Sequence, residues 1–559
     1  MSERILVAVA WPYANGSIHI GQTAGAYVPA DIFARYHRMK GNDVLMVSGS
    51  DSHGTPVTLE AENRGISPEE VFEHYHAEFL DCWDRLGISF DLFTSTHTEN
   101  HTEIAQDIFS QLYENGYLYT KTMLQPYSEA DGRFLADRYV EGTCPHCDFD
   151  GARGDQCDEC GRTLDAQELI GIRSRLSGDT PIFKETEHFF LKLTAFEDEL
   201  LDWIRPQAHW RPNVKNFSIG YLEGGLQDRP ITRDIEWGIP VPLDGYDGKR
   251  IYVWFEAVIG YLSASREWAT RRGEPDRWKD FWQSEDAKSF YFMGKDNIPF
   301  HTVIWPAMLL GYGGLNLPYD VPANEYMNLE GMKLSTSRSW AIWLPDYLDR
   351  YDPDPLRYVI AAGMPETSDS DFSWTEYVRR NNDELVATFG NLVHRVLTMS
   401  YRNFDGVVPT PGRLDDDSQA LLDEAERRFR EVGENLALCK FRAALMEGAM
   451  ALAQAANRYL DRKAPWQTAK TDRIATATTL WTAMTVINCL KKALYPYLPF
   501  SGEKLHAMLG FEGSVADDGW DWSPTDLTSG QSLQKPAPLF QKLDEAIAEQ
   551  ETERIGQQR

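Results

Sequence analysis

Four of the seven cysteines stand in two closely spaced pairs within the segment CPHCDFDGARGDQCDEC. Cys144 and Cys147 form the first CxxC pair, nine residues follow, and Cys157 and Cys160 form the second. Two such turns can present four thiolates at the corners of a tetrahedron, which is the arrangement of a closed, structural Zn²⁺ site. The alternative is four reduced thiols in a loop. Because that alternative leaves the spacing unexplained, the pattern predicts one structural zinc ion.

A second candidate site is PYANGSIHIG, residues 12–21. Residues 5–10 before it are apolar or small without alternation, as in a parallel strand covered on both faces. PYANGS has the composition of a turn, and helical spacing begins at about Ile18. A helix amino terminus at the carboxyl end of such a strand suits phosphate, and Gly21 would let a nucleotide approach the backbone. The segment predicts a nucleotide site; alternatively, His19 only caps the turn.

A third candidate is GMKLSTSR, residues 331–338, which combines a glycine, a lysine, small hydroxyls and an arginine. Cations and hydroxyl donors in one loop can follow the charge that moves to a leaving pyrophosphate. A solvated turn has the same composition. This segment therefore gains weight only in combination with PYANGSIHIG.

The amino-acid composition is typical of a globular protein. The chain has 559 residues, of which 42% are hydrophobic and 25% charged. No apolar run is long enough for a membrane span, and the N-terminus lacks the pattern of a secretory signal, so we expect a cytoplasmic protein without membrane contact. The net charge of −30 argues against nonspecific nucleic-acid binding but allows a specific partner bound through a local basic surface.

Strands and helices alternate to about residue 115, and the pattern resumes where RIYVWFEAV and KSFYFMGKD read as strands that lead into helices. We expect a Rossmann-type α/β fold with a parallel sheet, split by an insertion and followed by an all-α helix bundle. The tail has little that could form a core. The expected division is 1–115 for the first half of the nucleotide-binding fold, 116–230 for the inserted zinc-knuckle domain, 231–325 for the second half, 326–385 for the KLSTS loop region, 386–515 for the bundle and 516–559 for the tail.

These segments together carry a family resemblance. PYANGSIHIG resembles the HIGH block of class I aminoacyl-tRNA synthetases, and KLSTS resembles their KMSKS loop. The surrounding blocks resemble the methionyl-tRNA synthetase family, in family order, from residue 5 to about residue 470: FLADRYVEGTCPHC, RDIEWGIPVP, YVWFEAVIGY, FMGKDNIPFHTVIWPAML, DFSWTEYVRRNNDEL, FGNLVHR and APWQTAK. They cover more than four fifths of the chain.

The resemblance implies a site for each substrate. The residues that match the methionine pocket are Ala10, Trp11, Tyr13, Trp254, Ala257, Tyr261 and His301, with Asp51 as the carboxylate for the substrate ammonium. Aromatic and small apolar walls suit an unbranched thioether. The residues that match the ATP site are His19, Gly21, Gln22, Lys295, Asp296, Lys333 and Thr336. The residues that the resemblance implies for catalysis are His19, Gln22, Lys333, Thr336 and Arg338. Asn391, Arg395 and Trp466 match the residues that read the CAU anticodon, by stacking on and addressing unpaired bases.

Two residues depart from the family pattern. Gln22 replaces the second histidine of the HIGH block, and Thr336 replaces the second lysine of the KMSKS loop. Glutamine can still donate to a phosphate oxygen but cannot carry charge. We expect Lys333 or Arg338 to supply the missing cation.

The implied activity is a methionine-tRNA ligase that uses Mg²⁺ with ATP, L-methionine and tRNA(Met). One alternative is a class I relative that charges isoleucine, valine, leucine or cysteine; the editing enzymes have larger insertions, and the cysteine enzyme holds zinc in its pocket. The other is a catalytically impaired paralogue that binds tRNA or senses amino acids, because of Gln22 and Thr336. The resemblance also leads us to expect a monomer, because no appended dimerisation domain follows the bundle.

Overall fold

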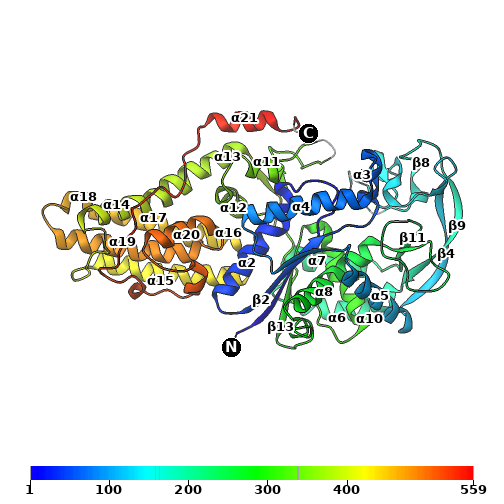
Figure 1. The fold of residues 1–559 in the computed structure, drawn as a ribbon, viewed down its shortest axis with the longest axis horizontal. Coiled ribbons are helices and arrows are strands. Elements are labelled where there is room, and N and C mark those ends of the chain that lie inside the picture. The colour runs from blue at the N-terminus through cyan, green and yellow to red at the C-terminus, as the bar shows by residue number, and fades with distance from the viewer. Residues whose placement is uncertain (1, 158, 161, 163, 337–338, 558–559) are drawn as a thin grey trace.

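The computed structural model describes residues 2–157, 159–160, 162, 164–336 and 339–557. It confirms the expected fold class, with a split parallel sheet near the middle of the long axis, the inserted strands at one end and a helix bundle at the other (Figure 1). Arg338 lies outside the described residues.

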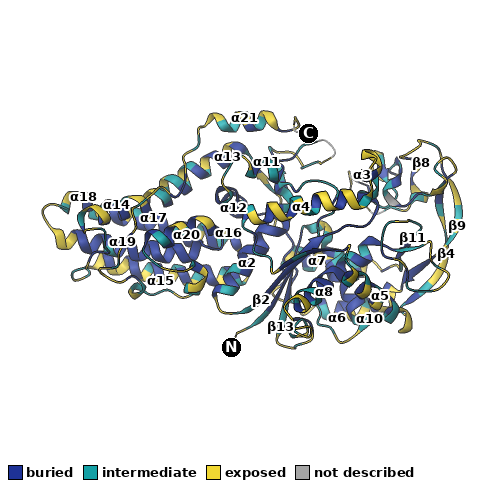
Figure 2. Ribbon diagram, in the orientation of Figure 1, coloured by how far each residue is buried: buried dark blue, intermediate teal, exposed yellow. Residues whose placement is uncertain are grey.

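The central sheet has four parallel strands in the order β13–β1–β2–β3. Their bounds are Ala287–Phe292 (β13), Arg4–Val9 (β1), Asp43–Ser50 (β2) and Leu92–Ser95 (β3). Helices cover both faces of this sheet, which is why its strands are dark blue along most of their length in Figure 2. Alternate residues of β1 pack into different cores, which explains the absence of alternation in its sequence.

One core contains helices α2 (Val28–Met39) and α4 (Pro68–Leu86), and the other contains α5 (Glu99–Glu114), α8 (Val253–Arg271) and α10 (Trp305–Tyr312). The expectation that RIYVWFEAV forms a strand is wrong. Only Arg250–Ile251 (β12) is extended there, and α8 begins at Val253. Because α8 is buried around most of its first turns, its apolar run lacks a polar face and imitates a buried strand.

The insertion between α5 and α8 is built on a long antiparallel hairpin of β4 (Leu118–Ser128) and β9 (Ile182–Leu191). The chain between these two strands forms a small three-stranded lobe that contains the paired cysteines. The other elements of this region are β5 (Arg133–Phe134), β6 (Val140–Thr143), β7 (Asp150–Arg153), β8 (Ile170–Ser174), α6 (Glu197–Ile204), α7 (Pro212–Glu223), β10 (Arg229–Pro230) and β11 (Thr232–Arg233).

After the sheet, a two-stranded parallel pair of β14 (Met327–Leu329) and β15 (Ser370–Phe372) supports the KLSTS loop. Helices α11 (Leu344–Leu348), α12 (Pro353–Ala362) and α13 (Trp374–Arg379) join this pair to the bundle. Arg357 of α12 is fully buried and pairs with Asp31 of α2 at 2.6 Å. Its guanidinium also donates to the carbonyls of Pro496 and Tyr497, so it ties the bundle to the sheet.

The helix bundle consists of α14 (Asn391–Asn403), α15 (Asp416–Ala437), α16 (Phe441–Ala443), α17 (Ala451–Lys463), α18 (Pro465–Thr468), α19 (Arg473–Leu494) and α20 (Pro499–Met508). The tail forms no separate core, but its apolar residues Leu527, Leu533, Leu539 and Phe540 enter the core of the bundle. It then returns as α21 (Ala546–Arg554) beside α13 (Figure 1). Glu551 of α21 pairs there with Arg350 at 2.9 Å.

The remaining α-helices of the described residues are α1 (Ile20–Gln22), α3 (Thr55–Arg64) and α9 (Lys279–Trp282), and π-helical segments at Thr23–Tyr27, Phe300–Ile304, Arg380–Gly390 and Ala444–Met450 continue neighbouring helices. Within the described part of the chain, none of the helices combines the length and apolar character required to span a bilayer.

Candidate active site

The turn after β1 begins a helix with a reciprocal cap. The Nδ1 of His19 accepts a hydrogen bond from the Gly21 amide at 3.1 Å, and the Oε1 of Gln22 accepts one from the His19 amide at 3.1 Å. Burial lowers the pKa of His19 to about 4, so the ring is neutral. Because Nδ1 is an acceptor, the proton lies on Nε2, which makes His19 a neutral donor. Gln22 retains its amide NH₂ as a donor.

The KLSTS loop and the residues after it lie against this turn. The Ile20 amide donates to the Ile342 carbonyl at 3.1 Å, and the Leu344 amide donates to the Ile18 carbonyl at 2.7 Å. A Cβ at Gly21 would lie 2.5 Å from Cδ1 of Leu334, so the leucine of KLSTS sits directly on this glycine. Two segments more than 300 residues apart therefore meet at the carboxyl end of β1.

The residues after β13 reach the same edge, because β13 is the neighbour of β1. Asn324 links the two: its side chain donates to the Ala24 carbonyl at 2.9 Å, and its own carbonyl accepts from the Lys295 amide at 2.8 Å. Lys295 pairs with Glu325 and with Asp369, each at 2.8 Å.

Of the KLSTS residues, Lys333 and Thr336 are exposed. Asp296, at the adjacent edge, accepts a hydrogen bond from the Tyr326 hydroxyl. Lys333 therefore brings a cation to the edge that also carries His19, while Thr336 brings no charge.

Asp51 lies at the end of β2, on the other side of β1. Its backbone pairs with the loop after β1, since its amide donates to the Pro12 carbonyl at 2.8 Å and its carbonyl accepts from Ala14 at 2.9 Å. The side chain is 3% exposed, and its Oδ1 has no hydrogen-bond partner in the described structure. Burial, and then the Glu256 carboxylate, raise the pKa of Asp51 well above its ordinary value. A buried carboxylate oxygen without a partner is suited to a cationic ligand.

A cluster of aromatic side chains adjoins this carboxylate. The rings of Trp11 and Tyr261 pack edge to face with centroids 6.4 Å apart. A Cβ at Gly49 or at Gly260 would lie within 3 Å of the Trp11 ring, so these two glycines make the space that the ring fills. The Tyr261 hydroxyl lies 2.8 Å from Nε2 of His301.

Burial lowers the pKa of His301 to about 4, so this ring is neutral too. Its Nδ1–H donates to the Asn297 carbonyl at 2.9 Å, and its Nε2 therefore accepts from the Tyr261 hydroxyl. This chain of hydrogen bonds fixes the His301 ring in the tautomer with its proton on Nδ1.

The other residues expected to bind methionine lie beside this aromatic cluster or on the same elements. Trp254 donates from its indole to the Tyr13 hydroxyl at 2.7 Å, and Tyr13 pairs with Asp51 through the backbone. Ala257 lies one turn after Trp254 and one turn before Tyr261 on the same face of α8. Ala10 directly follows β1, and its amide donates to the Phe292 carbonyl at 2.9 Å.

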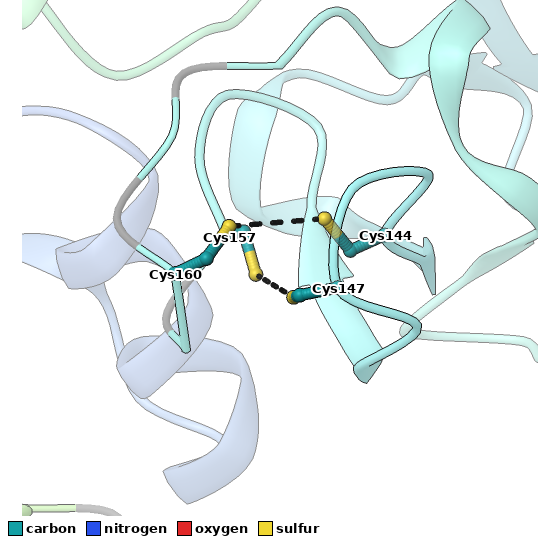
Figure 3. A group of neighbouring side chains, drawn as sticks. All are labelled: Cys144, Cys147, Cys157 and Cys160. Carbon is teal, nitrogen blue, oxygen red and sulfur yellow. Dashed lines mark hydrogen bonds between the residues drawn. The ribbon is translucent and has the colours of Figure 1, made fainter.

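The four paired cysteines gather in one corner of the inserted lobe (Figure 3). All four sulfurs lie within 4.8 Å of one another, with 3.6 Å between Cys147 and Cys157 and 4.0 Å between Cys144 and Cys160. The edge of a tetrahedron with 2.3 Å bonds from its centre to sulfur is about 3.8 Å. The group can therefore hold a metal ion.

Comparison with known proteins decides the family. The model described as "tRNA synthetases class I (M)" matches residues 5–397, and "Anticodon binding domain of methionyl tRNA ligase" matches residues 408–559. The chain belongs to the methionyl-tRNA synthetase family. A methionine–tRNA ligase of Thermomicrobium roseum is 54% identical over 99% of both chains, and one of Dehalococcoides mccartyi is 57% identical over 100% of both. The solved Mycobacterium tuberculosis methionyl-tRNA synthetase in complex with methionyl-adenylate superposes with a TM-score of 0.79 at 27% identity, covering 97% of this chain and all of the other.

The part of the chain matched by the anticodon-binding model of this family includes Trp466. Its ring is 45% exposed, and the Arg395 guanidinium lies over it at 4.9 Å from the centroid. Arg395 also contacts Asp461 at 3.4 Å, and Asn391 lies one turn before it on the same face of α14. An exposed ring with a guanidinium over it offers a surface for an unpaired base.

The sequence did not lead us to predict a buried cluster of one carboxylate and two histidines in this methionyl-tRNA synthetase fold. Glu256 of α8 lies 2.8 Å from Nδ1 of His53 and 3.4 Å from Nε2 of His101. Burial works to raise the pKa of Glu256, but the two histidines outweigh it, so this pKa lies below its ordinary value. The cluster joins α8 to the loop after Asp51. A single acidic residue in the apolar run YVWFEAV is the signal that could have revealed it.

Proposed function

We propose that this protein activates L-methionine with ATP to methionyl-adenylate and transfers methionine to tRNA(Met). One observation carries the proposal: the His19 turn and the KLSTS loop meet at the carboxyl end of β1, beside a buried carboxylate with an unpartnered oxygen. Ligands of open α/β sheets bind at this end of the strands. The family membership supports the same substrates.

In the proposed complex, the methionine ammonium pairs with Asp51 and the thioether side chain enters the pocket of Trp11, Tyr261 and His301. The neutral state of His301 supports this, because an apolar thioether gains nothing from a charged wall. Sulfur–ring contacts contribute about 0.3–1.5 kcal/mol each. Tyr13, Trp254, Ala257 and Ala10 would close the rim.

The activation step needs no protein nucleophile. The methionine carboxylate attacks the α-phosphorus of ATP, the bond to pyrophosphate breaks, and the product is a mixed anhydride. His19 and Gln22 would donate to phosphate oxygens as neutral groups, and Lys333 would supply positive charge as it develops on pyrophosphate. Thr336 would contribute a hydroxyl donor, Gly21 would leave the room beside the His19 ring that Leu334 of the KLSTS loop occupies, and Lys295 and Asp296 would lie at the border of the ATP site. Mg²⁺ would accompany ATP as part of the substrate.

Transfer to tRNA completes the proposed reaction. The 2′-hydroxyl of the terminal adenosine attacks the methionyl carbonyl, and AMP leaves. The bundle, with Asn391, Arg395 and Trp466, would bind the CAU anticodon at the end of the molecule opposite the insertion, which would guide the acceptor end. We propose that the chain is divided accordingly. Residues 1–115 and 231–325 form the two halves of the nucleotide-binding fold, 116–230 the inserted domain, 326–385 the KLSTS loop region, 386–515 the anticodon-binding bundle and 516–559 the tail.

The metal of the cysteine group is proposed to be zinc, because four thiolates in a tetrahedral set suit a closed structural Zn²⁺ site. Cys144, Cys147, Cys157 and Cys160 would hold it. When bound, the ion cross-links the two turns of the lobe. The lobe in turn contacts α3, since the Tyr139 hydroxyl donates to Thr58 at 2.7 Å.

Metal removal is expected to disorder this lobe. Structural zinc binds small domains with about 10–16 kcal/mol, so losing it should unfold a lobe whose own core is small. Cys157→Ser should reduce the metal content from one zinc per chain to none and should open residues 140–175 to limited proteolysis. The matched control is Cys82→Ser, at a buried cysteine outside the group. Full zinc content in Cys157→Ser would overturn the assignment.

The proposed function is tested by amino-acid-dependent exchange of pyrophosphate into ATP, measured separately with each of the twenty amino acids. We expect exchange with methionine and none with the others above a few per cent. Exchange with isoleucine, valine, leucine or cysteine instead would indicate a different class I synthetase. No exchange with any amino acid, together with retained tRNA binding, would indicate a catalytically impaired paralogue.

A further inference from the structure

Tyr326, just before β14, lies beneath two ammonium groups and belongs to none of the family blocks. The Nζ of Lys295 is 4.0 Å from the centroid of its ring, and the Nζ of Lys333 is 5.1 Å from it. Both distances are within the range of cation–π attraction. The two lysines come from different segments, one after β13 and one after β14, so a single ring connects both edges of the ATP site.

The ring is held from several sides. The Tyr326 amide donates to Asp369 at 2.9 Å, its carbonyl accepts from the Ser370 amide at 2.9 Å, and its hydroxyl donates to Asp296. Lys295 is fixed as well, because it pairs with Glu325 and Asp369. A half-buried side chain with these attachments forms a stationary surface, whereas Lys333 itself is exposed.

Lys333 differs from Lys295 in its partners. Its ammonium group faces the ring of Tyr326, and no carboxylate of the described residues lies within ion-pair distance of it. Asp369 feels the charge of Lys333 but pairs with Lys295. A carboxylate would neutralise the lysine and compete with phosphate. An aromatic ring attracts the ammonium group and limits its positions, yet leaves the full charge available. This matters in a loop where threonine stands at position 336 and brings no second ammonium.

We propose that Tyr326 is a positioning residue for ATP activation, whose ring holds the Lys333 ammonium group where the triphosphate enters. This rests on the proposed function. The ring acts through Lys333 and does not touch the reacting atoms. Its effect should therefore appear in the use of ATP and not in the use of methionine.

The test compares Tyr326→Leu and Tyr326→Gln, which remove the ring, with Tyr326→Phe, which keeps it and removes only the hydroxyl. In methionine-dependent pyrophosphate exchange, both ringless variants should raise KM for ATP roughly ten-fold and leave KM for methionine within about two-fold. Tyr326→Phe should keep KM for ATP near that of the unmodified protein. Combining Tyr326→Leu with Lys333→Ala should add little to the effect of Lys333→Ala alone.

The matched control is Tyr127→Leu in the insertion, where Lys184 lies 3.4 Å from the ring centroid and no ATP residue is near in the sequence. It should leave KM for ATP unchanged. Equal KM values for ATP in all Tyr326 variants, or a Tyr326→Phe variant as impaired as Tyr326→Leu, would overturn the inference. Absence of methionine-dependent exchange in the unmodified protein would instead overturn the proposed function. Thermal unfolding and an unchanged KM for methionine verify that the ringless variants are folded.

Discussion

Asp51→Asn is expected to lower kcat/KM for methionine by about 10²–10⁴-fold. The substitution keeps the shape of the side chain and removes its charge, so the methionine ammonium would enter a buried site without a counter-ion. Breaking a buried ion pair by removing one partner costs about 3–5 kcal/mol, which corresponds to this range. The Oδ1 atom of Asp51 is buried and has no hydrogen-bond partner in the described structure, so it is free to accept from the ammonium group.

The measurement is pyrophosphate exchange at varied methionine concentration and saturating ATP. The matched control is Asp276→Asn, at a carboxylate that is 80% exposed and should not affect exchange. Since the ionised form of Asp51 binds the ammonium group and its pKa is raised, kcat/KM should fall as pH decreases through that raised pKa. The asparagine variant should lose this dependence. A variant within five-fold of the unmodified protein would show that Asp51 is not the ammonium site.

His19→Ala is expected to lower kcat of the exchange reaction by about 10²–10³-fold, the usual effect of removing one preorganised donor from a developing negative charge. The neutral ring, with its proton on Nε2, is such a donor. The loss should appear in kcat more than in KM for methionine, because the two substrates occupy different parts of the site.

The competing explanation is that His19 only caps the helix. His19→Asn separates the two roles, since asparagine is among the best N-cap residues. If asparagine restores the exchange rate to within about three-fold of the unmodified protein, capping is the main role of His19. If it restores thermal stability while exchange stays low, the imidazole acts on ATP.

The sequence was sufficient to predict elements whose residues face a single kind of environment. The apolar run of β1, the CxxC pairs and the polar residues after β1 and β2 each have a local cause, and the structure describes them where they were expected. Helix α8 was misread because burial around its first turns removes the polar face that marks a helix. The contribution of the tail was not predicted, because its few apolar residues form no core by themselves and instead join the core of the bundle.

In the candidate site too, only residues with a local sequence pattern could be predicted. His19 stands in a recognisable block and Asp51 directly follows an apolar strand, whereas Tyr326 and the cluster of Glu256, His53 and His101 depend on contacts between distant segments. Such contacts leave no local pattern. Gln22 was predicted only as a donor to phosphate. In the structure it also completes a capping box with His19, which depends on the local backbone geometry.

The central claim is that the His19 turn and the Lys333 loop act on the same triphosphate. The most direct test is a double-mutant cycle of His19→Ala and Lys333→Ala, measured as kcat/KM for ATP in methionine-dependent pyrophosphate exchange. Residues that act as a unit are not additive, so the double variant should fall short of the sum of the single effects by at least about 1 kcal/mol. Additive effects within about 0.3 kcal/mol would contradict the account.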